Sequence, residues 1–220
     1  MGGGRRGLSG VATLCASLAG ALACLGSCAQ PASPARGAPG EASASSTRFG
    51  IAFFGDSVSV GYGASGKGRG YVARVAGWLR THGMRVVTTN DARGGVPVAY
   101  WLNAAVPRRL DAVVVELGTN DVRLGTPSTR FADEYRRLTS RIRAADPGAQ
   151  VLCLSVWPRP GGESLERVIN TQIRAACPGT YVDITRLRDR PSIRAGDGFH
   201  PNDAGYRLIA QAVEAGLKTS

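Results

Sequence analysis

The stretch Ile51-Ala-Phe-Phe-Gly-Asp-Ser-Val-Ser-Val-Gly61 contains both a strand signal and a chemical one. The apolar run from Ile51 to Phe54 is typical of a fully buried strand, and it stops abruptly at Gly55-Asp56-Ser57. A turn there places the serine at the carboxyl edge of a sheet, where open α/β sheets bind ligands. Because a lone serine is a weak nucleophile, the chain must also supply a base and donors for an oxyanion.

The rest of the chain alternates short apolar segments with segments of helical periodicity. In one of the latter, Phe131, Tyr135, Leu138 and Ile142 recur at the spacing of a single buried helical stripe. This alternation predicts an α/β fold with three α/β/α layers and a five-stranded parallel sheet covered on both faces. The expected strands are residues 49–54, 85–89, 112–117, 151–156 and 181–184.

The chain has two histidines, and only one is placed to act as the base. His82 lies between a helix and a strand, where a helix-end residue is expected. His200 lies in a loop before the last helix, with Asp197 three residues earlier. A carboxylate at that spacing can fix the imidazole tautomer and leave the other ring nitrogen free for the serine proton. The alternative is that Asp197 and His200 only cap the helix and brace the loop.

Donors for an oxyanion follow two other strands. If the strand order is 2-1-3-4-5, Ser57 and Asn120 flank the topological switch point of the sheet. The backbone N–H groups of Ser57 and Gly95 and the amide of Asn120 then converge as an oxyanion hole. Gly94 remains an alternative to Gly95, and a turn or helix cap is the alternative for Asn120-Asp121.

These residues together resemble the SGNH hydrolases, also called the GDSL esterase/lipase family. The resemblance covers essentially all of residues 48–218, in order, and departs at Val58, where leucine is usual, and at Ala92, where a first glycine is common. It implies a flavodoxin-like fold of probable order 2-1-3-4-5 and ester hydrolysis without metal or cofactor by a triad of Ser57, His200 and Asp197. The four matching blocks are Gly55-Asp56-Ser57-Val58-Ser59, Asn90-Asp-Ala-Arg-Gly-Gly95, Gly118-Thr119-Asn120-Asp121 and Asp197-Gly198-Phe199-His200-Pro201.

The expected substrate is a small-molecule or glycan ester, with deacetylation of a polysaccharide as the favoured reaction. A lysophospholipase, a thioesterase and a non-catalytic surface glycan-binding module on the same fold are the alternatives. Four residues are hypothesised to line the substrate site, although each fits structural packing equally well: Tyr62, Val122, Arg123 and Trp157.

The first 28 residues have the pattern of an export signal rather than of the fold. Arg5-Arg6 precede an apolar segment over residues 8–25, and Leu25-Gly-Ser-Cys28 resembles a bacterial lipobox that would be lipidated at Cys28. An ordinary secretory signal or an uncleaved anchor is the alternative. Residues 29–47 are rich in Ala, Pro, Gly and Ser and predict a disordered tether, so the hydrolase domain is expected over 48–220. The expected product is a cell-surface or periplasmic lipoprotein, or otherwise a secreted protein.

The distribution of charge and the number of cysteines limit which binding partners and which covalent links the sequence predicts. The net charge is +11, but no run of five or six basic residues occurs, so a solvated basic surface is favoured and no nucleic-acid partner is expected. Cys153 and Cys177 form an even pair in the predicted domain and are a candidate disulfide, with two buried thiols as the alternative. No Cys/His spacing suggests a metal site, and a monomer is expected.

Overall fold

The fold is built on a parallel five-stranded sheet whose strand order confirms the prediction. The computed structural model describes residues 47–159 and 161–219, so the predicted signal, most of the tether and Cys28 lie outside the described residues. The strands follow the order β2-β1-β3-β4-β5, and every adjacent pair is parallel. They are β1 (Arg48–Gly55), β2 (Arg85–Asn90), β3 (Ala112–Glu116), β4 (Gln150–Leu154) and β5 (Thr180–Val182).

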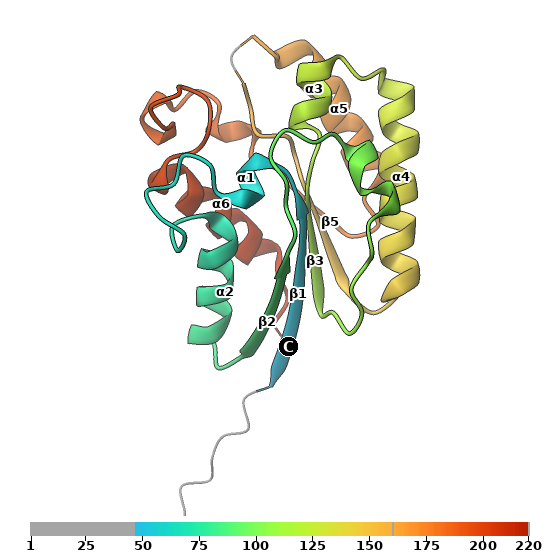
Figure 1. The fold of residues 1–220 in the computed structure, drawn as a ribbon, viewed down its shortest axis with the longest axis vertical. Helices are drawn as coiled ribbons and strands as arrows, with labels where there is room; N and C mark the ends of the chain where they lie inside the picture. Colours follow the sequence, from blue (N-terminus) through green and yellow to red (C-terminus); the bar gives the residue numbers. More distant parts are fainter. Residues whose placement is uncertain (1–46, 160, 220) are drawn as a thin grey trace, which may run out of the picture. The chain divides into compact units, whose positions relative to one another are not determined.

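Helices cover the sheet on both faces, as Figure 1 shows. The helices α2 (Tyr71–Thr81) and α6 (Asp203–Gly216) pack together on one face. On the other face α4 (Ser128–Ala145) packs against α5 (Glu163–Ala176) and the 3₁₀ segment η1 (Val98–Asn103). The short elements are α1 (Ser57–Val60), α3 (Thr119–Leu124), η2 (Thr185–Leu187) and η3 (Pro191–Ile193).

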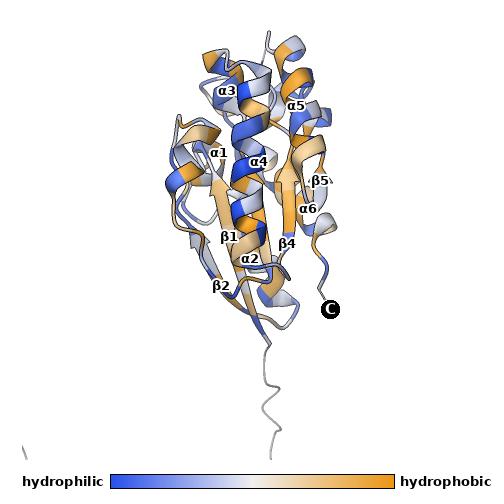
Figure 2. Cartoon of the chain, turned by 90° about the vertical axis from the view of Figure 1, so that its right-hand side faces the viewer, coloured by the Kyte–Doolittle hydropathy of each residue, from blue (hydrophilic) through white to orange (hydrophobic). Residues whose placement is uncertain are grey.

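Alternate side chains of β1 supply two separate cores. Ile51 and Phe53 pack in the core beneath α2 and α6, whereas Ala52 and Phe54 belong to the core beneath α4 and α5. This is the two-residue period of a strand that is buried on both faces. Figure 2 shows the hydrophobic strands enclosed by helices that turn hydrophilic residues outward.

The amphipathic pattern of α4 is confirmed, because Phe131, Tyr135, Leu138 and Ile142 are all fully buried. Burying each such side chain contributes about 1.5–3 kcal/mol to folding. The loop after β2, which carries Gly95, leads into a 3₁₀ helix that starts at Val98.

The last two strands end earlier than predicted. The N–H of Ser155 still donates to the Val182 carbonyl of β5. After Ser155, side chains replace the neighbouring strand as acceptors: the backbone N–H of Val156 donates to Asn170 Oδ1 at 2.9 Å, and that of Trp157 donates to Thr119 Oγ1 at 3.0 Å. Apolarity continues through Trp157, but the chain has already left the sheet. The hydrophobic run therefore marks burial here and overstates the length of the strand.

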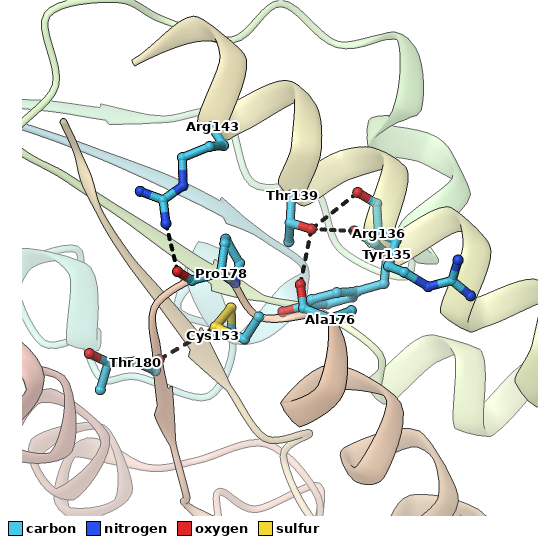
Figure 3. Close-up of a disulfide and its surroundings, with 9 residues drawn as sticks. Tyr135, Arg136, Thr139, Arg143, Cys153, Ala176, Pro178 and Thr180 are labelled. Atoms are coloured by element: carbon cyan, nitrogen blue, oxygen red, sulfur yellow. Dashed lines mark hydrogen bonds between the residues drawn. A yellow bond between two sulfur atoms is a disulfide. The ribbon is translucent and has the colours of Figure 1, made fainter. Parts of the chain in front are cut away.

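A disulfide links β4 to the segment after α5. Cys153 lies in the interior of the sheet and bonds Cys177, with their Cα atoms 6.0 Å apart. Two further contacts tie α4 to the same segment, since Thr139 donates to the carbonyl of Ala176 at 3.2 Å and Arg143 donates to the carbonyl of Pro178 at 2.6 Å (Figure 3). Within residues 47–159 and 161–219, no helix is long and apolar enough to cross a membrane.

We expect Cys177→Ser to lower the free energy of unfolding by about 3 kcal/mol, because the disulfide closes a loop with a sequence separation of 24 residues. The measurement is denaturant unfolding of wild type and variant, each with and without reductant. In reductant, the free energy of unfolding of wild type should approach that of the variant. Equal stability of the two proteins without reductant would contradict a stabilising bridge.

Candidate active site

Ser57 begins a single helical turn directly after β1. The Asp56 side chain caps this turn by accepting the backbone N–H of Val58 at 3.0 Å. Gly61 ends it with a left-handed φ of 95°, and its N–H donates to the carbonyls of Ser57 and Val58. The serine is therefore held at the carboxyl end of the sheet, and it is only 7% exposed.

The loop before α6 brings His200 and Asp197 to this serine. His200 Nε2 lies 3.0 Å from Ser57 Oγ, and His200 Nδ1 lies 2.5 Å from Asp197 Oδ2. The other Asp197 oxygen accepts the backbone N–H groups of Phe199 and His200. The hydrogen bond from His200, followed by that from Phe199, lowers the pKa of Asp197 below its ordinary value of 3.8. The three side chains, predicted from the first and last of the four blocks, thus form one continuous chain of hydrogen bonds.

The loop after α1 packs against the loop that carries His200. A Cβ on Gly63, which has a φ of +84°, would lie 2.7 Å from the carbonyl oxygen of Pro201 and 3.1 Å from His200 Cβ. The Tyr206 hydroxyl of α6 donates to the carbonyl of Tyr62 at 2.6 Å. Because these contacts hold the two loops together, they also fix the distance between Ser57 and His200.

Asn120 reaches the same place from the start of α3. Its Nδ2 donates to Asp56 Oδ2 at 2.7 Å, and Arg123 Nε donates to its Oδ1 at 3.3 Å, so both ends of the amide are oriented. Asn120 and Gly95 line the crevice of about 410 Å³ that contains Ser57. The neighbouring Asp121 has a separate structural role, because its Oδ2 accepts the backbone N–H of Val98 at 3.0 Å.

Both glycines of the second sequence block line this crevice, but they differ in what their backbones allow. A Cβ on Gly94 would lie 3.0 Å from the ring of Tyr62. Gly95 has open space around it and a left-handed φ of +79°, which side chains rarely adopt. Each position therefore favours glycine, one for close packing and the other for its backbone angle.

The residues expected to line the substrate site divide into two groups. Tyr62 and Arg123 line the crevice of Ser57, whereas Val122 lines an adjoining one. Trp157 does not reach this surface: it is fully buried, and its indole N–H donates to the carbonyl of Phe199 at 2.7 Å. Its large apolar ring is used for packing beneath the His200 loop.

Two lining residues were missed by the sequence reasoning, namely Phe199 and Arg159. Arg159 follows the end of β4, and its guanidinium lies 5.4 Å from the centre of the Phe199 ring. Arg159 could have been found from its position in the sequence, because it follows a strand and therefore lies at the same sheet edge as Ser57 and Asn120. The predicted helix-end residue His82 does end α2.

Comparison with known proteins identifies the family. The model of the GDSL-like Lipase/Acylhydrolase family matches residues 53–208. The chain belongs to this family. Its members hydrolyse ester bonds, so this GDSL-family protein is a hydrolase that acts on esters.

One relative in sequence agrees with that assignment, and solved structures share the fold. The GDSL lipase Rv0518 of Mycobacterium tuberculosis is 30% identical over 183 residues, which cover 74% of this chain and 79% of the relative. The esterase EstA of Pseudoalteromonas sp. shares the fold with a TM-score of 0.63 at 19% identity, covering 76% of this chain and 95% of its own. A family 3 carbohydrate esterase of Clostridium thermocellum has a TM-score of 0.61 at 18% identity, covering 77% and 94%.

Two buried carboxyl groups lie beneath the serine of this GDSL-family protein. Burial raises the pKa of Asp56 from 3.8 to about 6, although hydrogen bonds from Val58 and Asn120 oppose the shift. Burial also raises the pKa of Glu116 well above its ordinary range, and the neighbouring Asp56 charge raises it further. Glu116 accepts a hydrogen bond from Ser59 Oγ at 2.9 Å. We assign the negative charge to Asp56, because it has two donors, and the proton to Glu116.

We expect Asp56→Asn to change how stability depends on pH. The folded state binds the Asp56 proton more tightly than the unfolded chain does, so this group's contribution to stability is fully present below about pH 3.8 and is lost as pH rises through about 6. Wild type should therefore lose stability relative to the variant between pH 4 and pH 7. Denaturant unfolding at several pH values measures the difference.

The matched control is Asp91→Asn, which removes an exposed carboxyl from the loop after β2. Its stability difference from wild type should stay flat over the same pH range, because the side chain is exposed and, among the described residues, makes no buried contact. A flat difference for Asp56→Asn as well would contradict the assigned shift.

Proposed function

We propose that this protein hydrolyses carboxyl esters through a covalent acyl-enzyme on Ser57. The observation that carries the proposal is the line of hydrogen bonds from Asp197 through His200 to Ser57 Oγ. His200 serves as the general base in this proposal, and Asp197 holds its imidazole in the tautomer that leaves Nε2 free to accept a proton.

The first half-reaction forms the acyl-enzyme. His200 Nε2 takes the Ser57 proton while Ser57 Oγ attacks the ester carbonyl, and the carbonyl oxygen becomes an oxyanion. The tetrahedral intermediate then expels the alcohol, which receives the proton from His200. In the second half-reaction water attacks the acyl-enzyme with His200 again as base, and the acid leaves while Ser57 recovers its proton.

The oxyanion is assigned to the backbone N–H groups of Ser57 and Gly95 and to the Asn120 amide. Asp56 supports this assignment, since it accepts one of the two Nδ2 hydrogens of Asn120 and orients the other. A donor that is positioned before the reaction stabilises the developing charge without reorganising during the step.

For the substrate, we favour an acetylated glycan over a long-chain lipid ester. The carbohydrate esterase among the structural neighbours supports this choice, whereas the lipase among the relatives favours the lysophospholipase or thioesterase alternative. Turnover of aryl acetates compared with aryl laurates separates the two. A glycan-binding module without catalysis would turn over neither.

We expect Ser57→Ala to lower kcat by about 10³-fold or more, because neither Asp197 nor His200 can replace the serine in forming the acyl-enzyme. His200→Ala should be nearly as severe, and Asp197→Ala milder, since the base remains and only its orientation suffers. Asn120→Ala should lower kcat by about 10²–10³-fold with little change in KM, because its donor acts on the developing oxyanion. Hydrolysis of p-nitrophenyl acetate measures each effect.

His82→Ala is the matched control for the histidine, because His82 lies at the end of α2, away from the crevice. It should retain wild-type turnover. Full activity of Ser57→Ala, or equal losses in His82→Ala and His200→Ala, would reject the assignment.

We further propose that the protein is exported and acts as a monomer tethered by a lipidated Cys28. The support for export and for the lipid anchor is the sequence pattern of residues 1–47. Two acyl chains suffice for stable membrane attachment, so the protein should fractionate with membranes, and Cys28→Ala should release it. Membrane fractionation together with intact-mass analysis tests this, and an unmodified amino terminus beyond residue 28 would reject it.

A further inference from the structure

Two arginines stand where the crevice of Ser57 meets its neighbour. Arg123 comes from α3 and Arg159 from the segment after β4, and each lines both hollows. The first holds about 410 Å³ and contains Ser57, and the second holds about 400 Å³ beside the start of α5. An ester bound at Ser57 that extends into the second hollow must pass both guanidinium groups.

These two guanidinium groups keep most of their donors unused. Among the described residues, neither arginine forms an ion pair. With the residues that the structure describes, Arg123 makes two long hydrogen bonds, to Asn120 Oδ1 at 3.3 Å and to the Gly95 carbonyl at 3.5 Å. Within residues 47–159 and 161–219, the Arg159 guanidinium makes no hydrogen bond, and it lies over the Phe199 ring. Since a guanidinium has five N–H donors, both can still bind an anion.

The nearby carboxylates already have other partners. Glu163 and Glu166 both pair with Arg188, and Asp197 bonds His200. Glu166 also accepts the backbone N–H of Arg159 at 2.8 Å, which uses the main chain of this arginine and leaves its side chain free. In the described part of the chain, no carboxylate therefore neutralises the two positive charges that line both hollows.

We propose that this junction is an anion-binding subsite and that the preferred ester carries a carboxylate or phosphate group bound by Arg123 and Arg159. The inference rests on the proposed function, because it takes Ser57 as the nucleophile. The planar fork of arginine matches the paired oxygens of both anions. A purely aliphatic chain in the same place would bury charged groups without a partner, which costs free energy. The stacking of Arg159 on Phe199 holds one of the two groups in place.

The test compares two matched pairs of esters. The acyl pair is 4-methylumbelliferyl hydrogen succinate and its methyl ester, which share one leaving group. The alcohol pair is 4-acetoxybenzoate and 4-acetoxybenzamide, which share one acyl group. For each pair the anionic selectivity is the ratio of kcat/KM for the charged ester to kcat/KM for the neutral one, after uncatalysed hydrolysis is subtracted. Selectivity in the acyl pair would place the bound anion on the acyl side of the ester. Selectivity in the alcohol pair would place it on the alcohol side.

The variants are Arg123→Gln and Arg159→Gln, each of which removes one positive charge. We expect each to lower the anionic selectivity about fivefold or more in the responding pair, as for a lost hydrogen bond to a charged group. The matched control is Arg137→Gln on the exposed face of α4, which removes the same charge away from the crevice. It should retain the wild-type selectivity, because a distant exposed charge is screened by salt.

Three results would overturn the proposal: no anionic selectivity of wild type in either pair, selectivity that survives either crevice variant, or an equal fall in Arg137→Gln. If a crevice variant fails to fold, the subsite is tested on the wild-type enzyme alone. The measurement is then the inhibition of its turnover of 4-acetoxybenzamide. Succinate should inhibit it more strongly than succinamide, and equal inhibition would overturn the subsite. Failure of the proposed function looks different, since wild type would then hydrolyse none of the four esters, or Ser57→Ala would hydrolyse them equally well.

Discussion

The hydrogen bond between Asn120 and the buried carboxylate of Asp56 is the interaction on which the site depends. Asp56 follows β1 and Asn120 follows β3, and these strands are neighbours in the sheet. The same carboxylate caps the helical turn that presents Ser57. One buried charge therefore sets the direction of the serine turn and the orientation of the Asn120 amide together, so the two groups cannot move independently.

This arrangement has a cost in stability. Asp56 and Glu116 are both fully buried, and burial opposes their ionisation. Hydrogen bonds offset part of that cost, since Asp56 accepts two and Glu116 accepts one from Ser59. A well-packed apolar pair here would avoid this penalty, but it would leave the Asn120 Nδ2 group without the acceptor that orients it. The cost is retained at the site because a donor held in place before the reaction needs no reorganisation during it.

The other half of the site comes from a distant part of the chain. His200 lies 143 residues after Ser57 and meets it through loops rather than through the sheet. Gly63 makes the close approach possible, and Tyr206 and Asp203 of α6 bind the loop that contains Tyr62 and Ser65. The sheet therefore positions the nucleophile and the amide, and packing of two loops on α6 positions the base.

Local patterns in the sequence were sufficient to predict the five strands, apart from the ends of the last two, and the residues now seen to converge. The strand order came from the resemblance to the SGNH hydrolases. A strand buried on both faces must be apolar throughout, and the residue types at its end identify a nucleophile and its donors, so Ser57, Asn120 and His200 stood out before any contact was known. The walls of the crevice could not be predicted in this way. Trp157 lies inside and Arg159 lies at the junction, although both follow the same strand. Which of them faces the substrate depends on how the chain turns after β4 and on what α5 and the His200 loop cover, and those are long-range contacts that no local pattern encodes.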